Sequence, residues 1–474
     1  MKDASIDTDA PATGGPQRAG AAPVSERARR AVAGTLLAHP WFDHATLFGL
    51  KHIFFPASRL WAAADEAHGD VARFFAAVPM PVRHEHTERW AAILTGYEEA
   101  RAAADAIDAA WERVFFGAAE SRPQDRIAIE AARQSARHHL NGKRWALRAR
   151  AGRHVPRAKL AIATPAEVAA LYGGGPAAFK ARAAPPATMP VVEMSRALPT
   201  AAGRDYWLRF PSPSARLGDI ATARVHEPHD AANAPTIIFG HGICVEFDHW
   251  KGLLDESQAL LSRGFRVIRP EAPGHGRRAK PGRFGGEPAI GEFPTGMLDS
   301  FSGALQEWAV LSHWVRSRSA APLVFGGSSL GAMTSQLAAE HAADWPEAYR
   351  PEALFLVTHT GDMAASVLGG ALSTLWASPA EIAKQGWTPE RAHAYLSLVN
   401  PSGPLAMPAH HVVSILGRRD VILSYPSGRD LVQQWGVPPE NAFAWDRGHF
   451  SVPTTLIRTT APLDRLLAIV AALR

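Results

Sequence analysis

The stretch that decides the fold is Gly326-Gly327-Ser328-Ser329-Leu330-Gly331, which contains the pattern G-x-S-x-G. The apolar run Pro322-Leu323-Val324-Phe325 precedes it and predicts a short buried strand, and residues 332–339 follow with the composition of a helix. A strand that turns sharply into a helix leaves the central serine strained with its hydroxyl exposed, and larger side chains at the flanking glycines would collide. Ser329 is therefore a candidate nucleophile. The alternative is an ordinary turn rich in Gly and Ser.

The chain around this turn alternates short apolar strands with helices from about residue 205 onward. Such alternation predicts a mostly parallel sheet that helices cover on both faces. We expect strands at residues 220–225, 236–239, 265–269, 353–358, 412–416 and 442–445. Helices are expected at residues 251–263, about 298–315, 427–435 and 454–473. The predicted fold class is α/β, with a long irregular region at about 360–407.

The first 200 residues have a different composition, which predicts a separate organisation. Residues 1–25 are rich in Ala, Pro, Gly and Ser, and we expect them to form a disordered tail. Residues 26–200 are expected to form a helical N-terminal region and, from about residue 160, a linker rich in Pro and Gly. The second domain would then span residues 201–474.

The most apolar part of the helical region runs from Trp41 to Phe55. We favour a helix that packs on the second domain over a helix that lies on a membrane surface or acts as a lid. A basic run follows from Arg133 to Lys159, and its spacing predicts one solvated helix face. Because this run carries no nucleic-acid-binding motif, we expect no nucleic-acid partner.

Composition excludes several classes of protein. Cys244 is the single cysteine in 474 residues, so no internal disulfide and no cysteine-rich metal site can form. The sequence has no apolar run of signal-peptide length and no stretch of about 18 apolar residues, which predicts a cytoplasmic protein. Neither a glycine-rich phosphate loop nor a metal-ligand cluster is evident, so we expect no cofactor and no metal.

Residues 205–474, a little over half of the chain, resemble the α/β-hydrolase superfamily, in particular its serine esterases and lipases. The resemblance rests on the turn at Ser329, on Gly240-His241-Gly242, on Pro273-Gly274-His275-Gly276, and on an Asp and a His after the next strands. It implies an α/β-hydrolase fold and the chain order nucleophile, acid, histidine. The first 200 residues resemble no such family. Where superfamily members commonly carry a serine after the second of these loops, this chain has Arg277-Arg278.

The resemblance assigns catalytic roles to three residues. Ser329 would be the nucleophile, and His449, in the loop after the last expected strand, would be the base that activates its hydroxyl. Asp420 would hold the imidazole in one tautomer. Asp362 is the alternative acid, because some members place the acid after the preceding strand. Asp446 is too close in sequence to His449 to be the first choice.

An acyl-transfer site also needs donors for the developing oxyanion. The expected donors are the backbone N–H groups of Leu330 and Ile243. The loop that contains Ile243 has His-Gly but lacks the His-Gly-Gly-Gly of many lipases and esterases. Cys244, beside Ile243, is either a nucleophile or, as we favour, a small packed thiol.

The expected function is hydrolysis of a carboxylic ester through an acyl-enzyme. Thioesterases and peptidases use the same machinery, and a catalytically silent binding protein with this fold is the alternative from another class. Apolar residues in the irregular region at 360–407, where the superfamily inserts its cap, favour a small acyl substrate that is apolar. The sequence leaves the oligomeric state open.

Overall fold

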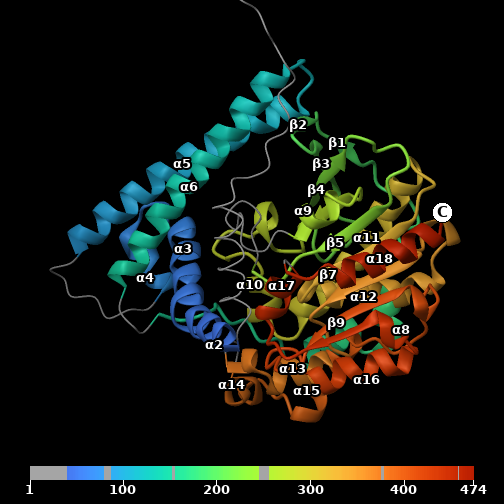
Figure 1. Ribbon diagram of the computed structural model, residues 1–474. Coiled ribbons are helices and arrows are strands. Elements are labelled where there is room, and N and C mark those ends of the chain that lie inside the picture. The colour runs from blue at the N-terminus through green and yellow to red at the C-terminus, as the bar shows by residue number, and fades with distance from the viewer. Residues whose placement is uncertain (1–39, 79–86, 152–154, 245–255, 375–377, 457) are drawn as a thin grey trace, which may run out of the picture.

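The computed structural model describes residues 40–474 apart from 79–86, 152–154, 245–255, 375–377 and 457. Figure 1 shows a sheet surrounded by helices and, beside it, a long pair of helices from the N-terminal region. The tail that the sequence predicts at residues 1–25 lies outside the described residues.

One sheet of ten strands forms the centre of the body. Its spatial order is β1-β3-β4-β6-β5-β7-β8-β9-β10, and β2 pairs with β3. The strands are β1 (Glu193–Met194), β2 (Leu198–Thr200), β3 (Gly203–Pro211), β4 (Ile220–Pro228), β5 (Thr236–Gly240), β6 (Arg266–Pro270), β7 (Leu323–Ser328), β8 (Ala353–Val357), β9 (Val412–Gly417) and β10 (Ala442–Trp445). Strands β5 to β10 pair in parallel, and β1 to β4 form an antiparallel extension that joins β6. The sheet is therefore mostly parallel, as predicted.

Helices cover both faces of the sheet because the side chains of each central strand alternate between two cores. In β7, Leu323 and Phe325 face a core that includes α11 (Thr295–Arg316) and α12 (Leu330–His341). Val324 faces the opposite core with α9 (Glu256–Leu261) and α18 (Ala461–Ala472). Every residue of β5, β7 and β8 is buried, as expected for parallel strands covered on two sides. The strand order and the turn after β7 are those of the α/β-hydrolase fold, which confirms the predicted fold class.

The predicted elements of this body are present with small differences at their ends. The helix expected near 427–435 is α16 (Tyr425–Trp435), and the helix expected at 251–263 overlaps α9 where residues are described. The single helix expected at 454–473 is instead two helices, α17 (Ser451–Leu456) and α18. The short helix α10 (Glu287–Gly291) and the strand β3 were not predicted.

The stretch expected to be a linker is folded onto the body. It contains α7 (Pro165–Tyr172) and α8 (Gly175–Arg182), and it supplies β1 and β2. Val168, Tyr172 and Phe179 are buried in the same core as α11. The Pro and Gly residues of this stretch predicted a linker, but here they lie at helix ends. Pro165, for example, is the first residue of α7 and directly follows the N-cap residue Thr164.

The N-terminal region is helical where it is described, as predicted. Its helices are α2 (Pro40–Gly49), η1 (Leu50–Phe54), α3 (Phe55–Ala67), α4 (Val71–Ala77), α5 (Thr87–Phe116) and α6 (Pro123–Arg150), where η1 is one turn of π-helix. Phe74, Leu94, Tyr97 and Leu140 are buried in a core that these helices share. Within the described ranges, no helix is long and apolar enough to cross a membrane.

The basic run on α6 is not the solvated face that its spacing predicted. Arg133 is buried, and its guanidinium donates to the carboxylate of Glu130 at 2.8 and 3.0 Å. Arg137 pairs with Asp108 of α5, and Arg144 stacks over the ring of Trp61 at 5.4 Å. These residues join α6 to its neighbours because α5, α6 and α3 pack side by side.

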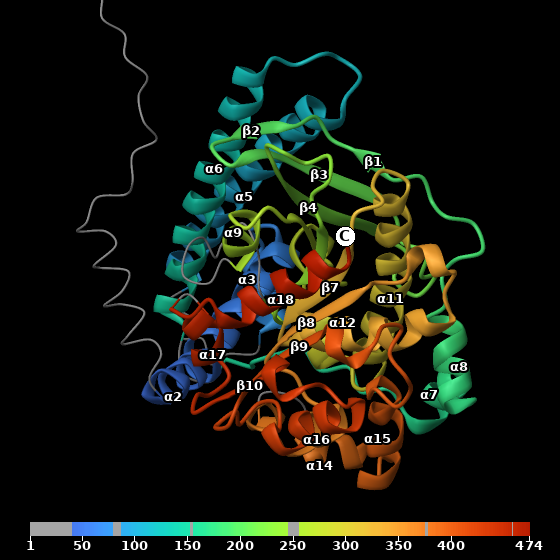
Figure 2. The same cartoon turned by 45° about the vertical axis from the view of Figure 1, so that its right-hand side comes forward.

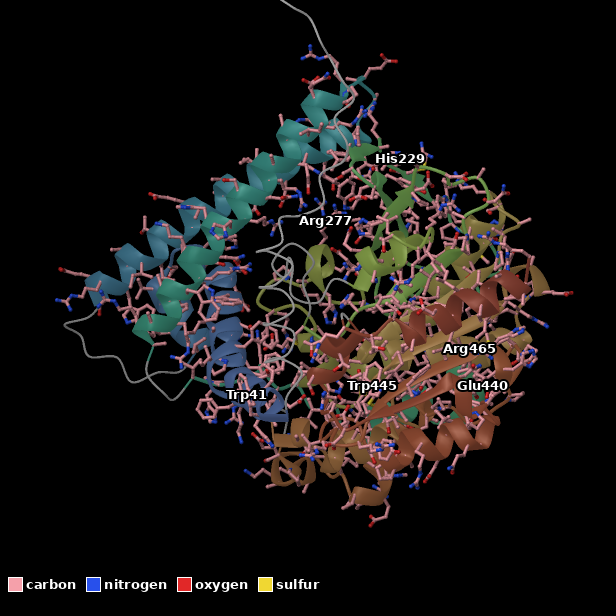
Figure 3. The ribbon with its side chains drawn as sticks, in the orientation of Figure 1. Trp41, His229, Arg277, Glu440, Trp445 and Arg465 are labelled. Carbon is pink, nitrogen blue, oxygen red and sulfur yellow. The ribbon has the colours of Figure 1, made fainter. Side chains whose placement is uncertain are left out.

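The α5–α6 pair rests on the antiparallel end of the sheet. Trp111 of α5 stacks edge-on against Trp207 of β3, with 4.9 Å between ring centroids. Figure 3 labels Arg277 between this pair and the sheet, where its guanidinium lies 4.3 Å from the Trp111 ring and pairs with Glu112. The neighbouring Arg278 is buried against Asp219 and Glu307. Arg277 therefore joins the body to the N-terminal helices, whereas Arg278 pairs within the body.

The region expected to be a cap contains short helices rather than an irregular chain. They are α13 (Met363–Gly369), α14 (Pro379–Lys384) and α15 (Pro389–Leu396), and Figure 2 shows α14 and α15 at its lower edge. Trp387 is buried, stacks against Phe293 at 5.6 Å and donates its indole N–H to the carbonyl of Ala163 at 2.6 Å. Leu375 and Trp376, two of the apolar residues in this region, lie outside the described residues.

Candidate active site

Ser329 sits on a strained turn between β7 and α12. Its φ of 54° and ψ of −117° are unfavourable for a residue with a side chain. The flanking glycines are required, because a Cβ on Gly327 would lie 2.3 Å from the carbonyl carbon of Gly331, and a Cβ on Gly331 would lie 2.0 Å from the oxygen of Gly240. The backbone N–H of Ser329 donates to Val357 in β8 at 2.9 Å, which ties the turn to the next strand.

Three of the predicted residues meet at this turn. Nε2 of His449 lies 2.9 Å from the hydroxyl oxygen of Ser329, and Nδ1 of His449 lies 2.7 Å from Oδ2 of Asp420. The side chains of Asp420 and His449 are 3% and 7% exposed, so water does not compete strongly for these bonds. With the proton on Nδ1, which the carboxylate favours, Nε2 is free to accept the serine proton.

Asp420 is held by its own loop after β9. Its Oδ1 accepts from the backbone N–H groups of Ile422 at 2.8 Å and Leu423 at 2.9 Å, which leaves Oδ2 for the histidine. The two alternative acids have other partners. Asp362 caps α13 by accepting from the N–H of Ala365, and Asp446 forms an exposed pair with Arg419.

The predicted oxyanion donors lie in the expected elements. Leu330 is the first residue of α12, and Ile243 lies in the loop after β5. Two histidines fix this loop: His241 accepts from the N–H of Ala272 and His275 from the N–H of Cys244, each at 3.0 Å. Burial, and then the neighbouring His275, hold the pKa of His241 well below its usual value, which keeps it neutral.

Cys244 is buried as the favoured interpretation expected. It packs in an apolar cluster with Phe55, Phe284 and Ile290, and Ile243 lies against the same cluster. Its backbone φ of 61° is positive, and its N–H donates to His275, so the N–H of Cys244 is not available to an oxyanion.

Asp43 is a residue of the site region that the sequence analysis did not identify. It lies on α2 and is buried, and its Oδ1 accepts from the backbone N–H groups of Phe450 at 2.7 Å and Ser451 at 3.1 Å. Its other oxygen accepts from the hydroxyl of Ser451. A Cβ on Gly448 would lie 2.4 Å from the Asp43 carboxyl carbon. The N-terminal region thus holds the loop that carries His449, and the only sequence signal was one acid inside an apolar run.

The same N-terminal segment also reaches the opposite side of the site. Leu50, Phe54 and Phe55, along η1 and the start of α3, pack in the cluster that includes Ile243 and Cys244. One continuous helical segment, from α2 to α3, therefore contacts both the histidine loop and the loop with the proposed oxyanion donor. A π-helical turn in such a segment is frequent at functional sites.

An apolar cavity of about 250 Å³ lies between α10, α11 and the cap helices. Its walls include Phe293, Met297, Ile382 and Trp387. Ile290 lines this cavity and also belongs to the cluster around Cys244, so the cavity and the loop after β5 share one contacting residue. In the described part of the chain, no group of three or more His, Cys, Asp or Glu side chains could hold a metal ion.

Several solved structures share this architecture at low sequence identity. A cold-adapted esterase from an Arctic intertidal metagenomic library is 16% identical over 59% of this chain and 96% of its own, with a TM-score of 0.38. Acetyl xylan esterase 1 from Thermoanaerobacterium sp. JW/SL YS485 is 17% identical over 58% and 88%, with a TM-score of 0.39. An S-formylglutathione hydrolase from Agrobacterium tumefaciens is 13% identical over 59% and 99%, with a TM-score of 0.37. No family model and no curated protein matches the sequence.

Proposed function

We propose that this chain is a serine hydrolase that cleaves a carboxylic ester through an acyl-enzyme. The observation that carries the proposal is the hydrogen-bonded series Asp420–His449–Ser329, at 2.7 and 2.9 Å, at the strained turn after β7. Such a series gives a serine, which is otherwise a weak nucleophile, an adjacent base. The strain at Ser329 supports a functional role, because strained backbone persists where the surrounding structure enforces it.

The proposed reaction has two steps. The Ser329 hydroxyl transfers its proton to Nε2 of His449 while its oxygen adds to the ester carbonyl carbon, and the alcohol then leaves with that proton. Water next gives a proton to Nε2 and adds to the acyl carbon, which releases the acid and restores the serine. The N–H groups of Leu330 and Ile243 would stabilise the oxyanion in both steps, and each such donor is typically worth about 100- to 1000-fold in rate.

Asp43 is proposed as a positioning residue for this chemistry. It acts through the backbone of the loop, because its carboxylate accepts from the two backbone N–H groups that follow His449. Displacing an active-site group by about 1 Å costs on the order of 100-fold in rate. Through this carboxylate, the N-terminal region would belong to the catalytic apparatus rather than only extend the core.

The apolar cavity of about 250 Å³ beneath the cap supports a substrate with an apolar acyl or alcohol group. A thioester or a peptide would need the same three residues, and the site does not favour either over an ester. A catalytically silent binding protein remains the alternative from another class.

Turnover of p-nitrophenyl esters of increasing acyl length tests the proposal. We expect release of p-nitrophenol that falls by at least about 1000-fold in Ser329→Ala and in His449→Ala. His393→Ala, an exposed histidine of the cap, is the matched control and should keep the wild-type rate. Absence of turnover in the folded wild type across the series would favour the silent binding protein, and unchanged turnover in Ser329→Ala would refute the assignment.

A further inference from the structure

The segment formed by α2 and η1 has apolar residues on two sides, and only one side is packed. Its inner side carries Asp43, Leu47 and Phe54, which contact the body. On its outer side, Trp41 is 53% exposed, Phe48 is 62% exposed and Ile53 is 45% exposed. Figure 3 labels Trp41 at the edge of the molecule, away from the strands. The packing that the sequence predicted therefore leaves three of the eight large apolar side chains from Trp41 to Phe55 exposed.

A neighbouring helix carries a further exposed aromatic residue. Trp145 of α6 is 46% exposed, and its ring stacks edge-on against Trp61, which in turn meets Phe54. Arg148 of α6 donates to the carbonyl of His52 at 3.0 Å, which joins α6 directly to η1. We call Trp41, Phe48, Ile53 and Trp145 the outer face. Other exposed large apolar side chains of the described residues include Ile127, near the far end of α6, and Val191, Met194, Ile220 and Val421 on other segments.

The exposed charged residues on α2, on η1 and at the end of α6 are cations. Asp43 is the only acid between residues 40 and 64, and it is buried against the histidine loop. No acid occurs between residues 131 and 166, where Arg150 is exposed at the end of the helix that carries Trp145. Lys51 lies on η1 itself, and His44 and His52 are exposed on the same segment. Exposed aromatic residues on segments whose own exposed charges are cations match the surface of an anionic lipid layer.

We propose that the outer face docks on an anionic lipid surface. Trp41 and Phe48 lie seven residues apart, or about two helical turns, so they project from the same side and reach one plane. A protein partner would need acids opposite Lys51 and Arg150, and the exposed aromatic residues would then require a matching apolar groove. A lipid layer provides both features without shape complementarity.

This docking would place the lipid close to the proposed active site. The inner side of α2 holds the His449 loop through Asp43, and a helix with its side chains is about 10 Å across. If the proposed hydrolysis is correct, the substrate is then an ester of a membrane lipid that enters from the docked surface. This statement about the substrate rests on the proposed function, whereas the docking itself does not.

Vesicle sedimentation of the Ser329→Ala variant tests docking without turnover. Vesicles of equal parts phosphatidylglycerol and phosphatidylcholine should bind the protein at low salt, and phosphatidylcholine alone should bind it more weakly. Trp41→Ser with Phe48→Ser should lower the partition at least about tenfold, because two large apolar side chains no longer enter the lipid. Lys51→Gln and Arg150→Gln should each lower it about fivefold.

Matched variants elsewhere on the surface make the test decisive. Val191→Ser with Met194→Ser removes two exposed apolar side chains far along the chain, and Lys384→Gln removes an exposed cation of the cap. Neither change should alter the partition of the protein onto the vesicles. Thermal midpoints show that each variant is folded. Docking is refuted if the mixed vesicles bind no protein, or if Trp41→Ser with Phe48→Ser binds as well as its parent. It is also refuted if these substitutions only dissolve a protein dimer. Ester turnover that persists while vesicle binding is absent would leave the proposed hydrolysis intact.

Discussion

At the scale of single residues, the candidate site could be predicted from sequence because its chemistry follows a chain order. The G-x-S-x-G turn identified Ser329, and the strands that follow it pointed to Asp420 and His449, which the structure brings within hydrogen-bonding distance. Asp43 could not be predicted in the same way. Its partners Phe450 and Ser451 lie about 400 residues away in the sequence, and no local sequence pattern predicts such a contact.

Substitution of Asp420 tests the proposed division of roles among these residues. Asp420→Asn removes the charge that favours the proton on Nδ1 of His449, and its amide can present an N–H to Nδ1 instead. The imidazole would then adopt the wrong tautomer, and kcat should fall by about 1000- to 10,000-fold with KM little changed. Asp362→Asn, at a helix cap, is the control that should keep kcat. A wild-type kcat in Asp420→Asn would contradict the assigned role.

At the scale of elements, the buried strands could be predicted and the edges of the sheet could not. β5, β7 and β8 are continuous apolar runs because both of their faces are covered. β1 and β2 are only two and three residues long, and they lie in a segment whose Pro and Gly suggested a linker. The exposure of Trp41 and Phe48 on α2 could not be predicted either, because both sides of this helix are apolar in sequence.

The contact between α2 and the histidine loop predicts an effect on catalysis from outside the sheet. Asp43→Ala leaves two backbone N–H groups after His449 without their acceptor, so the imidazole should shift and kcat should fall by about 100-fold. KM should change little, and Asp43→Glu should recover part of the rate. A substitution that only destabilises the fold would not lower kcat of the protein that remains folded, so these kinetic changes distinguish positioning from stabilisation.

Asp70→Ala is the matched control for this variant. Asp70 caps α4 by accepting from the N–H of Arg73 at 3.0 Å, and its loss should cost about 1 kcal/mol of stability. The rate of the folded protein should stay at the wild-type level. Equal kinetics for Asp43→Ala and Asp70→Ala would show that Asp43 only stabilises the fold.

At the scale of the whole molecule, buried histidines make stability depend on pH. Burial lowers the pKa of His359 to about 3 and the pKa of His341 to about 4. In the unfolded chain a histidine titrates near 6.5, so between pH 6.5 and about 4 the unfolded chain binds more protons than the folded chain. The contribution of these buried, neutral imidazoles to the free energy of unfolding is therefore fully present above pH 6.5 and declines on acidification. For His359 the loss at pH 5 is about 2 kcal/mol.

Thermal unfolding at pH 7 and pH 5 checks this prediction. The midpoint should fall on acidification, and the fall should be smaller by a few degrees in His359→Gln, whose amide can still bond the hydroxyl of Ser414. His393→Gln, at an exposed position, should behave like the wild type. An identical fall in all three proteins would mean that His359 does not contribute to the acid sensitivity.

The central claim is that Ser329 is a nucleophile activated by His449, and mass spectrometry after reaction with a fluorophosphonate tests it most directly. The probe needs an activated serine but no knowledge of the natural substrate, so its result is independent of acyl length and of lipid docking. We predict one phosphonate adduct per chain, on the peptide that contains Ser329, with labelling strongly slowed in His449→Ala and kept in Ser328→Ala. An adduct on another residue, or labelling that persists in Ser329→Ala, would contradict the account.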